Sequence, residues 1–206
     1  MALAEGQQYL VYNKASWIFW GLKQYMGKDK MQGAIRGFLQ EFGSKGPPYP
    51  TTKELVEALR AAAGPKWQQL ITDYWDRITF WDLGYDGDVT VEPNEAGGYT
   101  VNLTVMVDKK IASEKDGKET SVTKMDGENL DEWVEIGFYK EDPKKTLGDD
   151  WIKLERVHIT QPKTKLSFDL DERPAYVLLD PRRLLIERNV KDNVKTLPKE
   201  KLASKK

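Results

Sequence analysis

The spacing of apolar residues changes once along this chain, and that change constrains the fold more than any other feature. Up to about residue 80 the apolar side chains recur at helical spacing, and after Asp82 they alternate with polar ones. Helical spacing buries one face of a helix, whereas alternation buries one face of a strand. The sequence therefore predicts a multi-domain α+β chain, with an N-terminal α-helical subdomain followed by an antiparallel β-sandwich.

The first two helices are predicted over residues 8–26 and 28–42. The first segment is apolar on more than one side, with four consecutive large residues from Trp17 to Trp20, which is typical of a buried helix. The second carries apolar residues at helical spacing, so one of its faces should be buried. These residues are Met31, Ile35, Phe38, Leu39 and Phe42.

A loop rich in glycine and proline follows at residues 43–50 and separates these helices from the next two. Thr51 and Glu54 fit a capping box, in which the threonine caps a third helix and the glutamate reaches back to it. A fourth helix is predicted to carry the apolar residues between Trp67 and Ile78.

Short strands separated by polar turns are predicted in the second part of the chain. We expect strands within residues 99–107, 134–138 and 166–170, a closing strand near 174–181, and turns at 94–98, 115–118 and 145–150. The predicted domains are accordingly residues 1–82, residues 83–193 for the β-sandwich, and residues 194–206 for a disordered basic tail.

Composition excludes several classes of function. The 206 residues carry a net charge of −1, which argues against a general nucleic-acid-binding protein. The absence of cysteine excludes disulfides and thiol catalysis. The sequence shows neither a membrane-spanning apolar run nor a signal peptide, so we expect this chain by itself to be soluble.

The segment from Gln8 to Trp20 contains the run Tyr12-Asn13-Lys14-Ala15-Ser16. It resembles the Tyr-x-Lys-Gly-Ala helix of aminopeptidase N-type zinc metallopeptidases, the gluzincin group that includes leukotriene hydrolase. The resemblance continues through the amphipathic helix, the loop, the capped helix and the aromatic helix into the sandwich, over about residues 9–193. It is nearest to versions fused to a membrane permease region, and it departs from the family pattern at Ala15, where the family has glycine.

This resemblance implies that the chain is the C-terminal part of such a peptidase and that residues 1–82 are the helical end of its catalytic domain. In that family the tyrosine hydroxyl helps to stabilise the oxyanion of the tetrahedral intermediate, which makes Tyr12 the catalytic candidate. Tyr9 is a second phenol one turn earlier, but only Tyr12 has a lysine two residues later. The His-Glu-x-x-His zinc motif is absent from this sequence. We therefore expect no cofactor in this chain, zinc in the intact parent, and no activity of the chain alone.

Other candidate residues have structural explanations. His158 is the only histidine, and a single histidine in a predicted strand cannot form the family's zinc site. We expect it to be an exposed or hydrogen-bonded strand residue. The carboxylates between residues 126 and 135 lack the spacing of a calcium loop, so we expect a solvated turn before a strand. They are Asp126, Glu128, Asp131, Glu132 and Glu135.

Two classes of function stay open on this basis. The alternative to a peptidase fragment is a non-catalytic module of a membrane transporter-associated protein. Such a module would bind a protein or a glycan, or would serve as a scaffold. Such a module predicts an exposed apolar or aromatic patch on the sandwich. The expected partners are the upstream zinc subdomain and the permease region of the same parent, a peptide substrate in that parent, and a second copy of this chain through the first helix. The parent is expected to be membrane-associated.

Overall fold

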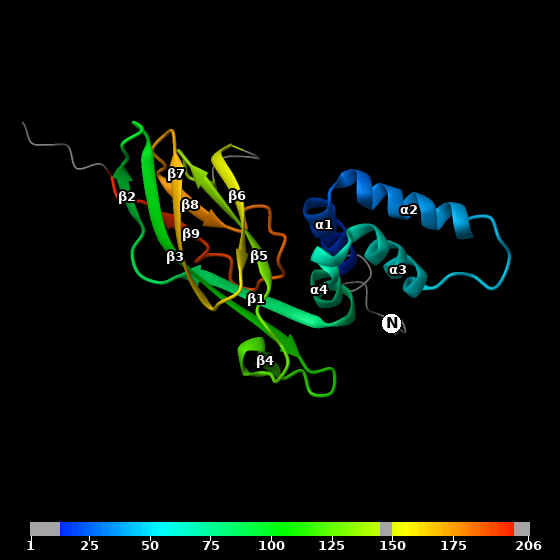
Figure 1. Ribbon diagram of the computed structural model, residues 1–206. Coiled ribbons are helices and arrows are strands. Elements are labelled where there is room, and N and C mark those ends of the chain that lie inside the picture. The colour runs from blue at the N-terminus through cyan, green and yellow to red at the C-terminus, as the bar shows by residue number, and fades with distance from the viewer. Residues whose placement is uncertain (1–12, 145–149, 200–206) are drawn as a thin grey trace, which may run out of the picture. The chain divides into compact units, whose positions relative to one another are not determined.

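The computed structural model describes residues 13–144 and 150–199, and the chain divides into two compact units between Thr79 and Phe80. Figure 1 shows the helices of the first unit and the two sheets of the second. Helices followed by two antiparallel sheets confirm the predicted α+β class. No helix among the described residues is long and apolar enough to cross a membrane.

The first two helices of the first unit are α1 (Ala15–Met26) and α2 (Lys28–Phe42). The predicted bounds of α2 and the predicted end of α1 are confirmed, whereas residues 8–12 lie outside the described part. The prediction that α1 is buried on more than one side is wrong. Its buried residues lie on one face, at the spacing of an amphipathic helix, and Trp20 is 42% exposed. In α2 the burial is confined to Met31 and Ala34, and Leu39 is 56% exposed.

The predicted capping box begins α3 (Thr52–Ala63). The backbone N–H of Thr51 donates to Glu54 Oε2 over 2.7 Å, and Thr51 Oγ1 accepts from the N–H of Lys53. These bonds satisfy amide groups that have no partner within the helix.

The predicted fourth helix is a series of short turns. A 3₁₀ turn, η2 (Pro65–Trp67), precedes α4 (Gln68–Ile71), and a π-helical turn, η3 (Thr72–Asp76), follows it. Assigning Ile78 to this helix was wrong, because it is the first residue of strand β1 (Ile78–Tyr85). The aromatic residues of this region form the core of the unit, where Tyr74 is fully buried and Trp67 packs on Tyr25 with ring centroids 5.2 Å apart.

A close contact joins α1 to η3. A Cβ added at Gly21 would lie 2.7 Å from Tyr74 Oη, which is shorter than a real Cβ contact. Only glycine therefore permits the buried tyrosine ring to pack against the backbone of α1.

In the second unit, the first sheet is built on the long strand β3 (Tyr99–Ala112). It pairs antiparallel with β2 (Thr90–Pro93), β4 (Glu119–Ser121) and β7 (Lys163–Leu170), and β1 is also its neighbour. The alternation predicted for β3 is confirmed, because Val101, Leu103, Val105 and Val107 are all buried. The predicted turn at residues 94–98 links β2 to β3, with Gly97 at φ 86°.

The second sheet has the order β6-β5-β8-β9. Its strands are β5 (Glu132–Tyr139), β6 (Trp151–Ile159), β8 (Tyr176–Leu179) and β9 (Val194–Thr196). The predicted inward face of β5 is confirmed, since Val134, Ile136 and Phe138 are fully buried. Phe138 meets Phe168 of the other sheet with ring centroids 5.0 Å apart, which places the core between the sheets.

The prediction that the chain is disordered from residue 194 onward is wrong for the first part of this tail. Residues Val194–Thr196 form β9 and pair with β8, and the buried Leu197 donates its N–H to Ala175 O. The apolar side chains of Val194 and Leu197 explain the difference, because the lysines around them keep their charged ends in water. Residues 200–206 lie outside the described part.

Candidate functional site

Tyr12, the catalytic candidate, and Tyr9 lie outside the described residues, so the structure bears on them only through the residues that follow. Ala15 is the first residue of α1 and is half-buried. Lys14 precedes it and holds the start of the helix in place. Its Nζ donates to the backbone oxygen of Arg77 over 3.0 Å, a bond between residues 63 positions apart.

Burial lowers the pKa of Lys14, and the nearby Asp76 carboxylate opposes that shift. The half-buried ammonium therefore joins the start of α1 to the end of the helical unit. Lys14 therefore fixes the backbone at a position two residues after Tyr12.

His158 lies on β6 and is 42% exposed at its side chain. Its Nε2 is hydrogen-bonded to Asp131 Oδ1, and its ring stacks on Trp133 with centroids 4.6 Å apart and an interplanar angle of 7°. This agrees with the prediction of an exposed or hydrogen-bonded strand residue. One imidazole and one carboxylate are too few ligands for a zinc site.

The acidic stretch does not form a single solvated turn, and that prediction is wrong for two of its five members. Asp126 and Asp131 are exposed, but Glu132 and Glu135 are 2% and 1% exposed. Glu132 Oε1 lies 2.6 Å from Nζ of the fully buried Lys109, and Glu132 Oε2 accepts from Trp81 Nε1 over 2.7 Å. These contacts compensate the buried carboxylate and join β1, β3 and β5.

Glu135 has two cationic partners, Arg156 and Arg182. Arg156 Nη2 lies 2.6 Å from its Oε1, and Arg182 Nε donates to its Oε2 over 2.8 Å. Burial by itself would raise the pKa of Glu135, but the two guanidinium groups hold it below its usual value.

Asp180, which the sequence did not single out, is a buried carboxyl group whose pKa lies far above its usual value. It accepts backbone N–H bonds from Leu184 and Leu185, each 2.8 Å long, and its own φ is 45°. Burial raises the pKa of Asp180 to about 7, against the effect of those two bonds. The Asp-Pro pair directly after an apolar run was the available signal, since Asp commonly closes such turns. The contacts are those of a loop-closing residue.

No group of three or more potential ligands, counting histidine, cysteine, aspartate and glutamate, comes together among the described residues. Zinc needs three or four such side chains at about 2 Å. The described residues therefore do not fit a zinc ion, and we derive no catalytic step through one.

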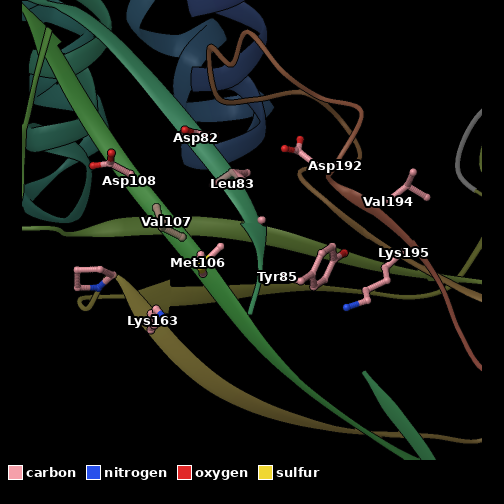
Figure 2. A pocket seen from close by; sticks show the side chains of 12 residues that line it. Asp82, Leu83, Tyr85, Met106, Val107, Asp108, Lys163, Asp192, Val194 and Lys195 are labelled. Carbon is pink, nitrogen blue, oxygen red and sulfur yellow. The ribbon is translucent and has the colours of Figure 1, made fainter. Parts of the chain in front are cut away.

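The second unit contains a hollow of about 560 Å³, which no sequence pattern indicated. Four sets of residues line it: Asp82–Tyr85 of β1, Met106–Asp108 of β3, Pro162 with Lys163 at the start of β7, and Asp192, Val194 and Lys195 near β9. Figure 2 shows β1 crossing the hollow, with the Tyr85 side chain turned toward Lys195. The Tyr85 hydroxyl donates to the backbone oxygens of Val177 on β8 and of Asn193, which directly precedes β9, and burial raises the pKa of Tyr85.

Comparison with known proteins finds a likeness in fold but none in sequence. No protein-family model and no curated protein matches the chain. The crystal structure of Legionella pneumophila aminopeptidase A in complex with aspartic acid matches it with a TM-score of 0.51 and 14% identity. The match covers 88% of this chain but only 18% of the aminopeptidase. At that identity the match shows a shared fold alone: this chain folds like one part of an aminopeptidase.

Proposed function

We propose that this chain is the C-terminal part of a zinc-dependent, aminopeptidase-like metallopeptidase, which hydrolyses peptides in its intact form. The observation that carries the proposal is a coincidence of motif and fold. A chain whose fold matches part of an aminopeptidase over 88% of its length carries a tyrosine motif whose last two residues begin its first described helix.

In this proposal Tyr12 donates its phenolic hydrogen to the oxyanion that forms on the substrate carbonyl. Removal of one such donor typically lowers kcat by about 10²- to 10³-fold. Lys14 acts as a positioning residue, because its bond to Arg77 O fixes the backbone beside the tyrosine. The zinc ligands and the general base are residues outside this sequence, in an upstream His-Glu-x-x-His helix.

The finer parts of the proposal rest on the sequence resemblance. They are that the parent is fused to a membrane permease region, that it is membrane-associated, and that the upstream zinc subdomain packs with this chain. These parts predict that the reading frame around this segment encodes both the zinc motif and membrane-spanning helices.

The test is to extend the chain upstream until it includes a His-Glu-x-x-His segment and to compare Tyr12→Phe with Tyr9→Phe in that longer protein. We expect Tyr12→Phe to lower kcat by at least 100-fold without loss of bound zinc. Tyr9→Phe, a matched loss of one hydroxyl a turn away, should change kcat by less than about threefold. An upstream frame without the zinc motif, or a Tyr12→Phe enzyme of normal kcat, would overturn the proposal.

The alternative of a protein- or glycan-binding module predicts an apolar or aromatic patch on the sandwich. Among the described residues of the sandwich strands, the exposed large apolar side chains are Ile78 at the start of β1, at 43%, and Met106 on β3, at 36%. Two single exposed residues are far smaller than the contiguous patches that mark broad docking surfaces. The observation does not favour this alternative.

A further inference from the structure

The hollow beside β1 has the size of a ligand site and an apolar floor. Its volume of about 560 Å³ lies within the range of about 300–1,000 Å³ that is usual for such sites. Gly84 contributes no side chain, and a Cβ placed there would meet only Met106 Cε, at 3.7 Å. The floor between the charged ends is formed by Gly84 and by the apolar side chains of Met106 and Val194, whereas the side chains of Leu83 and Val107 are buried in the core.

Charges of opposite sign stand at the two ends of this hollow. Asp82 and Asp108 lie together at one end, where they share Lys110 at 3.1 and 3.5 Å. At the other end Lys163 bonds Asp86 over 2.9 Å, and Lys195 Nζ donates to Gly87 O. Asp82 and Asp86 are four residues apart on an extended chain, so the two ends are about 13 Å apart.

Figure 2 shows the same polarity, with Asp82, Asp108 and Asp192 toward one end of the view and Lys163 and Lys195 toward the other. Asp82 and Asp108 share one lysine, and Asp192 accepts from the neutral amide of Asn189, so the first end is anionic. At the second end, Lys195 bonds a neutral carbonyl and keeps its charge uncompensated by that contact.

The hollow also runs beside an edge strand. β1 stands at the end of its sheet's strand order. On its outer side, Trp81 N donates to Ile186 O over 3.0 Å and Leu83 N donates to Glu187 Oε1 over 2.7 Å. These bonds occupy the edge as far as Leu83, and the hollow, which is lined from Asp82 onward, continues past them to Tyr85.

We propose that this hollow binds an extended peptide segment of about five residues, with a cationic side chain at the Asp82–Asp108 end and an anionic one at the Lys163–Lys195 end. Five residues in extended conformation span the ~13 Å between the charged ends. Extended peptides bind along sheet edges, where backbone groups give affinity and the flanking side chains select the sequence. Opposed charges at the two ends supply that selection. The site is independent of the proposed peptidase function, because none of its residues belongs to the helical unit.

The probes are fluorescein-labelled, end-blocked pentapeptides, titrated by fluorescence anisotropy at low salt. Lys-Val-Thr-Val-Glu carries both charges, Gln-Val-Thr-Val-Gln carries neither, and Lys-Val-Thr-Val-Lys carries only the cationic type. We expect the first peptide to bind at least tenfold more tightly than the second. Affinity of the first should also fall as the salt concentration rises.

Protein variants locate the binding. Lys163→Glu should weaken binding of the Lys/Glu peptide at least tenfold and strengthen binding of the Lys/Lys peptide. Lys165→Glu makes the same charge change at the next outward position of β7, outside this hollow, and should leave both affinities within about twofold. Gly84→Val should abolish binding by filling the hollow while the sheet stays folded, because only Met106 Cε lies within 4 Å of the new Cβ.

Three results would overturn the proposal. The first is an equal affinity for the charged and the uncharged peptide. The second is an equal effect of Lys163→Glu and Lys165→Glu on the affinity for the Lys/Glu peptide. The third is no binding of the Lys/Glu peptide to the full chain up to about 1 mM, the weakest affinity that would be meaningful. A Gly84→Val protein that folds and still binds would also reject it.

Discussion

Glu132→Gln should be among the most destabilising single changes in the sandwich. Glu132 is 2% exposed and its Oε1 lies 2.6 Å from Nζ of Lys109, which is fully buried. The amide keeps an oxygen for Trp81 Nε1, so the change mainly removes the negative charge opposite the lysine. Breaking a buried pair from one side costs about 3–5 kcal/mol, because an uncompensated charge stays in the core. That is a large share of the roughly 5–15 kcal/mol that stabilises a typical domain.

The assay is a double-mutant cycle by urea unfolding, followed by circular dichroism and tryptophan fluorescence. Lys109→Met together with Glu132→Gln removes both charges, and the pair should cost less free energy of unfolding than Glu132→Gln alone. The exposed neighbour gives a matched control. Lys110 and Asp82 also form a pair between β3 and β1, at 3.1 Å, but Asp82 is 52% exposed. Asp82→Asn should therefore cost less than about 1 kcal/mol.

The reasoning fails if Glu132→Gln costs no more than Asp82→Asn. It fails equally if the losses from Lys109→Met and Glu132→Gln simply add in the double variant, since additivity would mean that the two groups do not interact.

Three further predictions concern other parts of the chain. Gly21→Ala should destabilise the helical unit by about 1–3 kcal/mol, because the new Cβ would clash with Tyr74. Gly33→Ala, on the open side of α2, should instead stabilise the unit by about 0.5–1 kcal/mol. Urea unfolding midpoints that rank the two variants the other way would reject the packing argument. Burial raises the pKa of Asp180 from 3.8 to about 7, so its contribution to stability is fully present below about pH 4 and is lost as the pH rises through 7. Asp180→Asn should remove this pH dependence of the unfolding free energy, which is worth up to roughly 4 kcal/mol. Identical pH–stability curves for the two proteins would contradict the prediction. Trp20 is 42% exposed on α1, and we propose that it mediates self-association of the chain at high concentration. Sedimentation of the wild-type chain and of Trp20→Ser checks this proposal. A wild-type chain that stays monomeric at all concentrations would exclude it.

Local signals predicted the elements well wherever they were strong. The bounds of α2 followed from the spacing of its apolar residues. The capping box of Thr51 and Glu54 followed from residue type, because these side chains can bond the free amides at a helix start. The alternation of β3 predicted its buried face for the same kind of reason. The segment 67–78 was predicted less well, since aromatic residues at helical spacing occur equally in short 3₁₀ and π turns.

The buried ion pair shows how a signal can be present and still be overridden. Lys109 continues the inward series of Val105 and Val107, and Glu132 precedes Val134 by the same two-residue step. Alternation therefore pointed both charged side chains into the core, but charge alone suggested solvent. A charge is buried only when its counter-charge arrives from another strand, and that pairing depends on contacts far apart in the chain.

The sequence by itself determined that helices precede strands, the inward faces of β3 and β5 and the presence of the tyrosine motif, because each depends on residues within one or two turns of one another. Tertiary structure alone decided the rest: the contact of Gly21 with Tyr74, the partners of Glu132 and Glu135, the strand at Val194–Thr196, and the polarity of the hollow beside β1. Each of these joins residues from separate elements. Their energies arise from burial and charge pairing between segments distant in sequence, which no local pattern encodes.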